Sequence, residues 1–574
     1  MNAERLLQHY EQIADAPDAI ARLRRFILDL AVRGKLVPQD STDEPASQLL
    51  KQIATERARL EKAGAIRKAA ADLVQDEEAP FHVPQTWVWT RLGAIADWGA
   101  GSTPPRGNSD FYGGDIPWLK SGELNDNRKL AGSEETVTQL ALEKCSFRIN
   151  MPGDVLLAMY GATIGKVAIL AEQAVTNQAV CGCTPLSGVF NQFLFVFLLS
   201  RREQFHSASE GGAQPNISKI KIVWTPFPLP PLTEQHRIVA KVDELMALCD
   251  ELETARTERE TKRDRLAAAS LARLNTPDPE TFRDDARFAL DALPALTDRP
   301  DQIKQLRQTI LNLAVRGKLV PQDPADEPAV ELLARVAHEI AVYGKQNRVP
   351  KAQVDPILDD DVPFSVPNNW QWVRLAELFN VITDGDHQPP PKAEKGVAFL
   401  TIGNVTTGRL DFTGCRLVPE EYFNGLAPYR TPTKGDILYT VVGATFGRPA
   451  LVESDRAFCV QRHIAILKPA KFLNLKFLVS LLASPLVYDQ AARSTTGTAQ
   501  PTIALRPLRN FLVPLPPLAE QHRIVAKVDE LMALCGQLET SLTSADETRK
   551  KLLDALLAEA LAPVEVDALQ EAAE

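Results

Sequence analysis

The sequence has none of the features that mark secreted, membrane or metal-binding proteins. It holds only seven cysteines, none of them in a CxxC pair. The one close pair, Cys181 and Cys183, is interpreted as two small buried residues of a strand. No run approaches the roughly 20 apolar residues of a transmembrane helix, and no apolar stretch follows Met1, so no signal peptide is expected. We therefore expect a cytoplasmic protein with reduced cysteines.

The motifs of common catalytic sites are also missing. Residues 161–166 are one residue too short for a GxxxxGK[ST] phosphate loop, and no Ser or Thr follows them. The chain has no GxGxxG after a strand, no HExxH, no GxSxG, and no Asn/Asp-Pro-Pro-aromatic tetrapeptide of the kind that adenine methyltransferases carry. Asp154 and Asp436 each follow a glycine and are interpreted as turn residues. Enzymatic activity of this chain alone is therefore not expected.

The chain has fewer basic than acidic residues: 64 Lys and Arg and 74 Asp and Glu give it a net charge of −10. Taken alone, this balance argues against nucleic-acid binding. The charge is uneven, however. Residues 366–508 hold about 15 Lys/Arg against about 11 Asp/Glu, whereas the acidic excess lies in segments such as 278–291 and 355–361. Net charge is thus a weak guide for a chain built from several parts.

What the chain does have is a long internal repeat. Residues 228–249, PLPPLTEQHRIVAKVDELMALC, recur as residues 514–535 with one change, Thr233 to Ala519. The prolines predict an extended lead-in, and the apolar residues that follow recur at spacings of four and three, the pattern of a helix that packs along another helix. Both helices should run about 40 residues, to about Leu274 and Leu561, or about 60 Å. The predicted packing positions are Ile238, Val242, Leu245, Cys249 and Leu252 in the first copy and Ile524, Val528, Leu531, Cys535 and Leu538 in the second.

A second repeat precedes each globular part. LAVRGKLVPQD at residues 30–40 recurs unchanged at 313–323, where it ends a predicted helix at Gly34 or Gly317. A further helix is expected at 46–71 and at 329–341. Next come segments of short β-like runs and turns that agree only in skeleton. Near-identical helices beside divergent domains indicate that the domains recognise different things, whereas the scaffold meets the same partner, or its own copy, twice.

We therefore predict an α+β protein with internal pseudo-twofold duplication. Two globular mixed α/β domains are separated by two long antiparallel helices that form a coiled-coil spacer, and the N-terminal helices should close the chain onto the distal helix. The expected parts are an N-terminal helical region at 1–80, a globular domain at 81–232, a central spacer helix at 233–275, a linker and helical region at 276–363, a second domain at 364–518, and a distal helix with C-terminal tail at 519–574.

This order of parts resembles the DNA-specificity subunit of type I restriction–modification systems along essentially the whole chain. The residues that carry the resemblance are the PLPPLxEQxRIV lead-ins, each between a variable domain and a long helix. The resemblance implies two target-recognition domains, each recognising one half of a bipartite double-stranded DNA site. It also implies that the helices set the gap between half-sites and bind methyltransferase subunits. Compared with shorter members, this chain has extra helices at 1–80 and 276–363.

The resemblance further implies partners and their cofactors. Two modification subunits would methylate adenine with S-adenosylmethionine, and in the full complex two restriction subunits would use ATP and Mg²⁺ for translocation and cleavage. This chain itself is expected to bind no cofactor and no metal, and to have no catalytic residues.

DNA contact requires paired donors and acceptors for bases, and cations, hydroxyls or backbone N–H groups for phosphates. Loop residues of these types are the candidates. In the first domain they are Thr103, Arg106, Lys120, Ser121, Asn125, Arg128, Tyr160, Thr163, Lys166, Gln178, Gln214, Asn216 and Lys219. In the second domain they are His387, Gln388, Lys392, Asn404, Thr406, Arg409, Tyr439, Thr445, Arg448, Gln461, Arg462, His463, Thr498, Gln500 and Arg506.

Two other classes of function stay open from sequence alone. A structural adaptor, whose paired helices assemble other proteins without DNA recognition, would show no salt-dependent affinity for DNA. An enzyme of unknown type is disfavoured by the missing motifs. The divergent domains favour DNA recognition, because an adaptor has no need of them.

Overall fold

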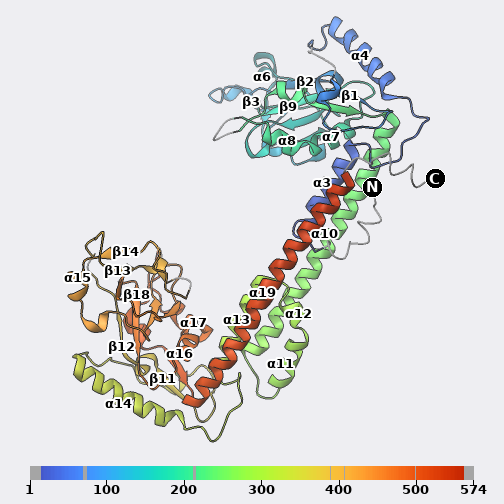
Figure 1. Cartoon of the computed structure of the whole chain (residues 1–574). Helices are drawn as coiled ribbons and strands as arrows, with labels where there is room; N and C mark the ends of the chain where they lie inside the picture. Colours follow the sequence, from blue (N-terminus) through green and yellow to red (C-terminus); the bar gives the residue numbers. More distant parts are fainter. Residues whose placement is uncertain are drawn as a thin grey trace. The chain divides into compact units, whose positions relative to one another are not determined.

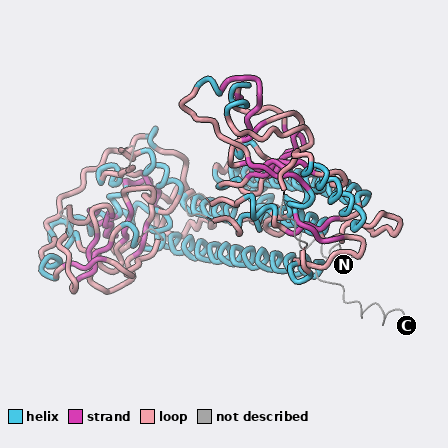
Figure 2. The backbone as a smooth tube through the Cα atoms, turned by 90° about the horizontal axis from the view of Figure 1, so that it is seen from above, coloured by secondary structure: helices cyan, strands magenta, loops and turns pink. Residues whose placement is uncertain are grey.

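The computed structural model describes residues 15–68, 74–210, 215–387, 390–405, 408–497 and 500–561. It divides into two compact units. Unit 1 holds the described residues up to Glu258 together with those from Asp546 onward, and unit 2 holds residues 259–545. Figures 1 and 2 show that each unit contains a globular domain with strands at its centre and loops around them. No helix among the described residues is long and apolar enough to cross a membrane.

The domain of unit 1 is built on two small sheets. The larger sheet has the strand order β2-β9-β6-β7-β4, with β2 at Ala96–Ala100, β9 at Val180–Pro185, β6 at Val155–Ala158, β7 at Val167–Leu170 and β4 at Asn127–Leu130. The smaller sheet has the order β5-β3-β8, with β5 at Thr136–Val137, β3 at Tyr112–Leu119 and β8 at Val175–Thr176. β6 and β7 are buried along their whole length, so they form the centre of the domain core.

Helices cover this core in unit 1. α7, at Asn191–Ser200, is nearly all apolar and packs against β6, β7 and α3 (Ala19–Val32). α4, at Ala46–Lys62, packs on α5 (Leu92–Ile95) and on β1 (Val88–Arg91), which pairs with β10 (Pro226–Leu229). Buried Arg57 fixes α4, because its guanidinium donates to the carbonyl of Gly93 at 2.7 Å. The shorter helices are α6 at Gln139–Lys144, α8 at Arg202–Ser207 and α9 at Lys219–Val223.

Unit 2 repeats this plan. Its sheets have the orders β12-β18-β15-β16 and β14-β13-β17, and β11 (Gln371–Arg374) pairs with β19 (Leu512–Leu515). The strands are β12 at Phe379–Asp384, β18 at Ile464–Pro469, β15 at Ile437–Thr440, β16 at Pro449–Leu451, β14 at Arg416–Val418, β13 at Val397–Leu400 and β17 at Phe458–Val460. The helices are α13 at Pro300–Val315, α14 at Ala329–Asn347, α15 at Glu420–Asn424, α16 at Leu475–Leu482, α17 at Pro485–Arg493 and α18 at Leu505–Arg509.

Two helices of 44 residues each, α10 (Leu232–Asn275) and α19 (Leu518–Leu561), connect the units. α10 begins in unit 1 and ends in unit 2, whereas α19 begins in unit 2 and ends in unit 1, so they run in opposite senses. Most of the predicted packing positions lie in the core of the unit where each helix begins. Ile238, Val242 and Cys249 are buried with α3 and α7, with Leu245 partly buried; Ile524, Val528 and Cys535 are buried with α13, with Leu531 and Leu538 partly buried.

Leu252 departs from this pattern, because it is 38% exposed; α10 becomes buried again only near its end, at Ala267, Leu271 and Leu274.

The last turns of each long helix pack on the short helix that precedes a globular domain. In unit 1, Leu553 and Leu556 of α19 cluster with Ala16 and Ala19, and Arg22 of α3 forms an ion pair with Asp554. In unit 2, the end of α10 packs on α11 (Phe282–Asp291), α12 (Leu293–Leu296) and α13. The N-terminal helix α3 therefore packs on the distal helix α19 as expected. In unit 2 the end of α10 makes the equivalent contact with α13.

The two repeated sequence motifs meet at a buried carboxylate. Glu234, in the first turn of α10, accepts a hydrogen bond from Trp87 Nε1 at 2.9 Å and one from Gln39 Nε2 at 2.5 Å. Arg237 pairs with Asp43 at 2.6 Å. Burial raises the pKa of the Glu234 carboxyl. Gln39 and Glu234 belong to the two different repeated motifs, so the two motifs contact each other at this point.

Unit 2 contains the same arrangement. Glu520 accepts from Trp370 Nε1 at 2.9 Å and from Gln322 Nε2 at 2.6 Å, and Arg523 pairs with Asp326 at 2.6 Å. We call these two arrangements the Glu234 junction and the Glu520 junction.

Two predicted helix ends were wrong. α4 ends at Lys62 rather than near residue 71, and α14 continues to Asn347 rather than ending at 341. The predicted glycine stops hold, since Gly34 and Gly317 follow α3 and α13 with φ of +67° and +65°. A Cβ on either glycine would also lie 2.5 Å or 2.6 Å from Pro84 or Pro367, so only glycine fits there.

Replacing Glu234 by Ala should destabilise the isolated subunit. The change leaves the buried Trp87 N–H without an acceptor and removes the partner of the exposed Gln39 side chain, which should lower the free energy of unfolding by about 1–3 kcal/mol. The matched control is Glu244→Ala on the exposed face of the same helix, with an expected change within about 0.5 kcal/mol. Denaturant titration of both variants measures the difference. Equal losses would show that the junction contributes no more than a surface carboxylate.

Candidate nucleic-acid interface

In unit 1, loops from separate parts of the sequence gather at one end of the two sheets. Backbone hydrogen bonds join them: Gly101 N–H donates to Val180 at 3.0 Å, Asn177 to Leu119 at 2.9 Å, Met159 to Ala179 at 2.8 Å and Ile217 to Met159 at 2.9 Å. Loops after β2 and β3, those between β6 and β7 and between β8 and β9, and the segment before α9 thus form one surface. We call residues 101–111, 120–126, 159–166, 176–179 and 215–219 loop face 1.

Most candidates of the first domain lie on loop face 1. Thr103 donates a hydrogen bond to Gln178, and Lys166 Nζ donates to Asn125 Oδ1 at 2.9 Å. Tyr160 forms a backbone bridge with Asn216, and Thr163 donates to the Tyr160 carbonyl at 2.8 Å. Lys219 forms no hydrogen bond or ion pair among the described residues, and Ser121 lies half-buried in the loop after β3. Gln214 lies outside the described residues.

Two cations of loop face 1, Arg106 and Lys120, pair with Glu135, which lies beside this face. Glu135 pairs with Arg106 Nη1 at 2.6 Å and with Lys120 Nζ at 2.8 Å. The hydrogen bonds from Arg106 and Lys120 lower the pKa of Glu135 to about 2, so this carboxylate stays ionised at neutral pH.

Arg128 has a structural role. It lies on β4, where its guanidinium pairs with Asp243 of α10 at 2.5 Å and donates to Gln192 at 3.0 Å. It also stacks over the Phe195 ring at 5.3 Å. These contacts engage Nη1 and Nη2 and attach the edge strand to the long helix, so Arg128, with its side chain 31% exposed, is a weaker candidate for DNA contact than Arg106.

In unit 2, the equivalent loops meet in the same way. Gln461 N–H donates to Leu400 at 2.9 Å, Val441 to His463 at 3.1 Å, Gly443 to Pro501 at 2.9 Å and Ile503 to Val441 at 2.8 Å. We call residues 385–387, 401–404, 441–448, 461–463 and 500–503 loop face 2. Gln461, Arg462, His463, Thr445 and Arg448 lie on it, with Gln500 at its border.

His463 and Arg462 are coupled on loop face 2. Arg462 Nε donates to His463 Nε2 at 3.3 Å, which requires a neutral imidazole. Burial, followed by the positive charge of Arg462, lowers the pKa of His463. His387 Nε2 lies 3.1 Å from Asp384, and Tyr422 O–H donates to Asp386 at 2.9 Å. This face therefore combines an exposed cation with polar side chains of fixed orientation.

The other candidates of the second domain differ in whether their side chains are already engaged in contacts within the protein. Lys392 and Arg409 are exposed and have no ion pair among the described residues, and Arg506 is 3.9 Å from Asp355. Asn404 is engaged locally, because it donates to the Asp411 carbonyl at 2.9 Å and accepts from Thr401 N–H at 2.8 Å. Gln388, Thr406 and Thr498 lie outside the described residues.

Tyr439 cannot contact DNA in this structure. It is fully buried in β15, and burial raises its pKa. Its position corresponds to Leu157 in β6, since both stand four residues after the Gly of the matching GD turns, so it is a core residue.

Sequence reasoning missed the residues that surround the candidate side chains. Glu135, Tyr112 and Trp118 hold Arg106, Asp384 contacts His387, and Tyr422 pairs with Asp386. These residues are carboxylates and aromatics, and their contacts appear only once distant segments meet. Among the described residues, no three His, Cys, Asp or Glu side chains are grouped as a metal site would require.

Comparison with known proteins agrees with this geometry. A family model described as the type I restriction modification DNA specificity domain matches residues 84–260 and again residues 367–545. The chain is 30% identical over 557 residues to the EcoAI type I restriction enzyme specificity subunit of Escherichia coli, covering 94% of this chain and 93% of that one. It is 30% identical over 576 residues to the EcoEI specificity subunit of the same organism, covering 94% of each chain.

A crystal structure of the HsdS subunit from Thermoanaerobacter tengcongensis aligns with 84% of this chain and 98% of that chain, at 22% identity and a TM-score of 0.42. With two matched specificity domains and two full-length relatives at 30% identity, the chain belongs to the type I restriction–modification specificity subunits, the non-catalytic subunits that recognise DNA sequence.

Proposed function

We propose that loop face 1 and loop face 2 each bind one half of a bipartite double-stranded DNA target. The observation that carries this proposal is the contrast between the two faces. The same strand ends and turns build both, yet face 1 presents a paired arginine and lysine, and face 2 presents Arg462 beside a neutral His463. Direct recognition of base edges depends on such differences in donors and acceptors, so the two faces would recognise different half-sites.

The long helices would fix the gap between the half-sites. Each helix is attached to one domain through the Glu234 or Glu520 junction and continues into the other unit. A helix of 44 residues is about 66 Å long and cannot shorten without breaking its hydrogen bonds. Because each domain is attached at a fixed place on such a helix, we expect a constant number of base pairs that neither domain contacts between the two half-sites.

The same helices also offer a surface for partner subunits. Leu232, His236, Ala240, Glu244 and Leu248 follow one another at steps of four residues and are all exposed, which makes an outward ridge on α10. α19 carries the identical residues, Leu518, His522, Ala526, Glu530 and Leu534, of which Leu518 is half-buried and the other four are exposed. Leu248 is 46% exposed and Leu534 48% exposed. Two identical ridges fit two copies of one partner, and the partner we propose is a methyltransferase subunit that packs a helix against each.

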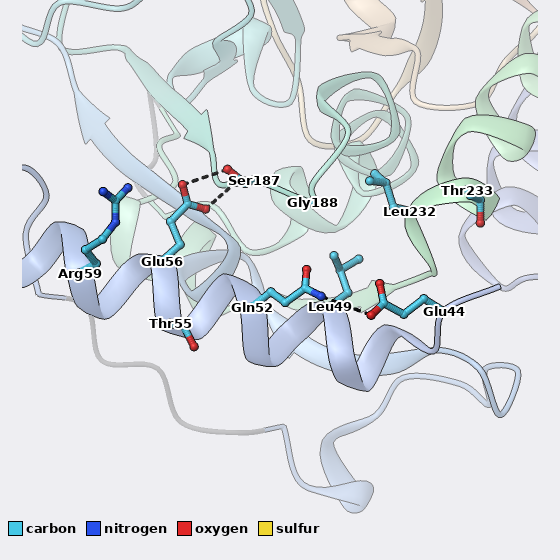
Figure 3. A pocket seen from close by; sticks show the side chains of 10 residues that line it. All are labelled: Glu44, Leu49, Gln52, Thr55, Glu56, Arg59, Ser187, Gly188, Leu232 and Thr233. Carbon is cyan, nitrogen blue, oxygen red and sulfur yellow. Dashed lines mark hydrogen bonds between the residues drawn. The ribbon is translucent and has the colours of Figure 1, made fainter.

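The two docking surfaces differ at one end. A pocket of about 720 Å³ adjoins the start of the α10 ridge, between α4 and Gly188, and its lining includes Leu49, Leu232 and Thr233 (Figure 3). Glu56 of α4 closes one side by accepting from Ser187 N–H at 2.8 Å. In unit 2, Glu339 of α14 accepts from Lys471 N–H at 2.8 Å in the same way, but the next residue is Phe472, 43% exposed. The additional helices α4 and α14 would thus extend the docking surfaces.

The assembly we propose contains two methyltransferase subunits that use S-adenosylmethionine, joined in the full complex by restriction subunits that use ATP and Mg²⁺. This chain would bind none of these cofactors and would act on DNA in the cytoplasm as part of a defence against foreign DNA. The chemistry of methylation and cleavage would lie wholly in the partners.

A methylation map tests the recognition role directly. We expect DNA from cells that co-express this chain and its neighbouring methyltransferase to carry adenine methylation at a split motif with a constant gap, because two domains on rods of fixed length recognise two separated sites. Sequencing that detects modified bases reads the motif. Identical methylation without this chain, or no split motif, would favour the adaptor alternative instead.

Replacing Arg462 and His463 together by Ala should change methylation through the second half-site only. The double variant removes the exposed cation and the imidazole from loop face 2 and leaves loop face 1 intact. The expected result is a relaxed or lost second half of the motif with the first half and the gap retained. Replacement of Arg493, an exposed cation on α17, by Ala is the control. An unchanged motif in the double variant would remove both residues from DNA recognition.

Introducing a charge on each ridge tests partner docking. Leu248→Glu and Leu534→Glu each place a carboxylate in an apolar contact, so each should weaken one docking site by at least about 30-fold. Mass measurement of the assembly should then give one methyltransferase subunit per chain for each single variant and none for the double variant. Leu290→Glu, at a leucine of α11 that is 69% exposed, is the control. Two bound subunits in the double variant would place docking elsewhere.

A further inference from the structure

Arg106 is held in one orientation on loop face 1. Its Nη1 and Nη2 both donate to the Glu135 carboxylate, at 2.6 Å and 3.3 Å. The guanidinium also lies over two aromatic rings, 4.9 Å from the centre of Tyr112 and 5.1 Å from that of Trp118. Despite these contacts, the side chain is 58% exposed. An exposed arginine that is fixed on several sides has already lost most of its rotamer freedom before any ligand arrives.

The groups around Arg106 are themselves fixed. Tyr112 O–H donates to the Pro104 carbonyl at 2.7 Å, and Trp118 Nε1 donates to the Ser102 carbonyl at 3.1 Å. Trp118 is only 1% exposed. Lys120 holds Glu135 from another side at 2.8 Å. The hydrogen bonds of Tyr112 and Trp118 attach the loop that carries Arg106 to two positions of strand β3.

The remaining donors of Arg106 suit a base better than a phosphate. A guanidinium has five N–H groups, and Glu135 takes two of them, which leaves three. A phosphate approaching these donors would also meet the Glu135 carboxylate, whose negative charge repels it. The major-groove edge of guanine is uncharged and presents two acceptors, O6 and N7, which an arginine can bind together.

The second domain differs at the matching place. Both domains have a cation directly after a run of prolines, Arg106 after Pro104 and Pro105 in one and Lys392 after Pro390 and Pro391 in the other. Lys392 is exposed and has no ion pair among the described residues. A lysine is a mobile point charge, whereas an arginine presents a planar fork. The two domains thus retain a cation here and differ in its geometry, as expected where they recognise different bases.

We propose that Arg106 recognises one guanine of the first half-site and that Glu135 is the residue that positions it. This inference rests on the proposed binding of DNA by loop face 1 and adds the base and the orienting carboxylate. Glu135 also offsets the charge of Arg106, which reduces the attraction of this loop for DNA of any sequence. The pair therefore favours discrimination over general affinity.

Base-resolved methylation maps and DNA titrations of the complex with its methyltransferase test this assignment. R106A should bind the cognate site about 10- to 100-fold more weakly, and one G·C pair of the first half-site should become unspecified while every other position is kept. R106K should recover salt-dependent affinity without recovering that guanine. E135Q should lose discrimination at the same base pair and gain affinity for unrelated DNA, a combination that a merely structural ion pair would not give.

Lys144→Ala, which removes an exposed cation of α6 in the same domain, is the control and should leave the motif unchanged. A first half-site without a G·C pair would overturn the assignment, as would an R106A motif identical to that of the wild type. Full recovery of base discrimination by R106K would show that charge alone suffices and would also overturn it. Absence of any split motif in the wild-type map would contradict the proposed function itself, before any variant is considered.

Discussion

The structure depends on a buried carboxylate that joins a long helix to a domain. Glu234 and Glu520 are almost fully buried, and each accepts a hydrogen bond from a tryptophan N–H of its own domain and from a glutamine of the preceding motif. A buried carboxylate is costly unless its acceptors are satisfied, so the tryptophan, the glutamine and the glutamate have to be present together. This requirement fixes how the first turn of each long helix is attached to its own domain.

The duplication adds a second constraint, because each helix serves both units. The beginning of α19 packs with α13 in unit 2, and its end packs on α3 in unit 1. A substitution in a helix therefore has to satisfy its own domain, the short helix at the far end and, in our proposal, a partner on the exposed ridge. Loop-face residues have fewer constraints, since the side chains of Thr103, Lys166 and Arg462 form their hydrogen bonds with side chains of the same or neighbouring loops. This difference explains how the loops diverged while the helices stayed nearly identical.

These same physical differences decided what could be predicted from the sequence. The long helices, the glycine stops at Gly34 and Gly317 and the closure of the chain followed from periodicity and repetition, which are local or self-comparing signals. Tyr439 and Arg128 were misjudged because a tyrosine in a core strand and an arginine bound to a distant helix look like surface polar residues in sequence. Glu135 was missed because the value of a carboxylate beside an arginine lies in a contact 29 residues apart.

The charge arrangement indicates how affinity and specificity divide between this chain and its partners. On loop face 1 both Arg106 and Lys120 are paired with Glu135. Sequence-independent attraction to DNA comes from cations that neutralise phosphates, and paired cations contribute little to it. In the assembly we propose, this arrangement would favour discrimination between bases over sequence-independent attraction. The cations that neutralise the DNA phosphates would then lie mainly on the proposed methyltransferase subunits, and base recognition on this chain.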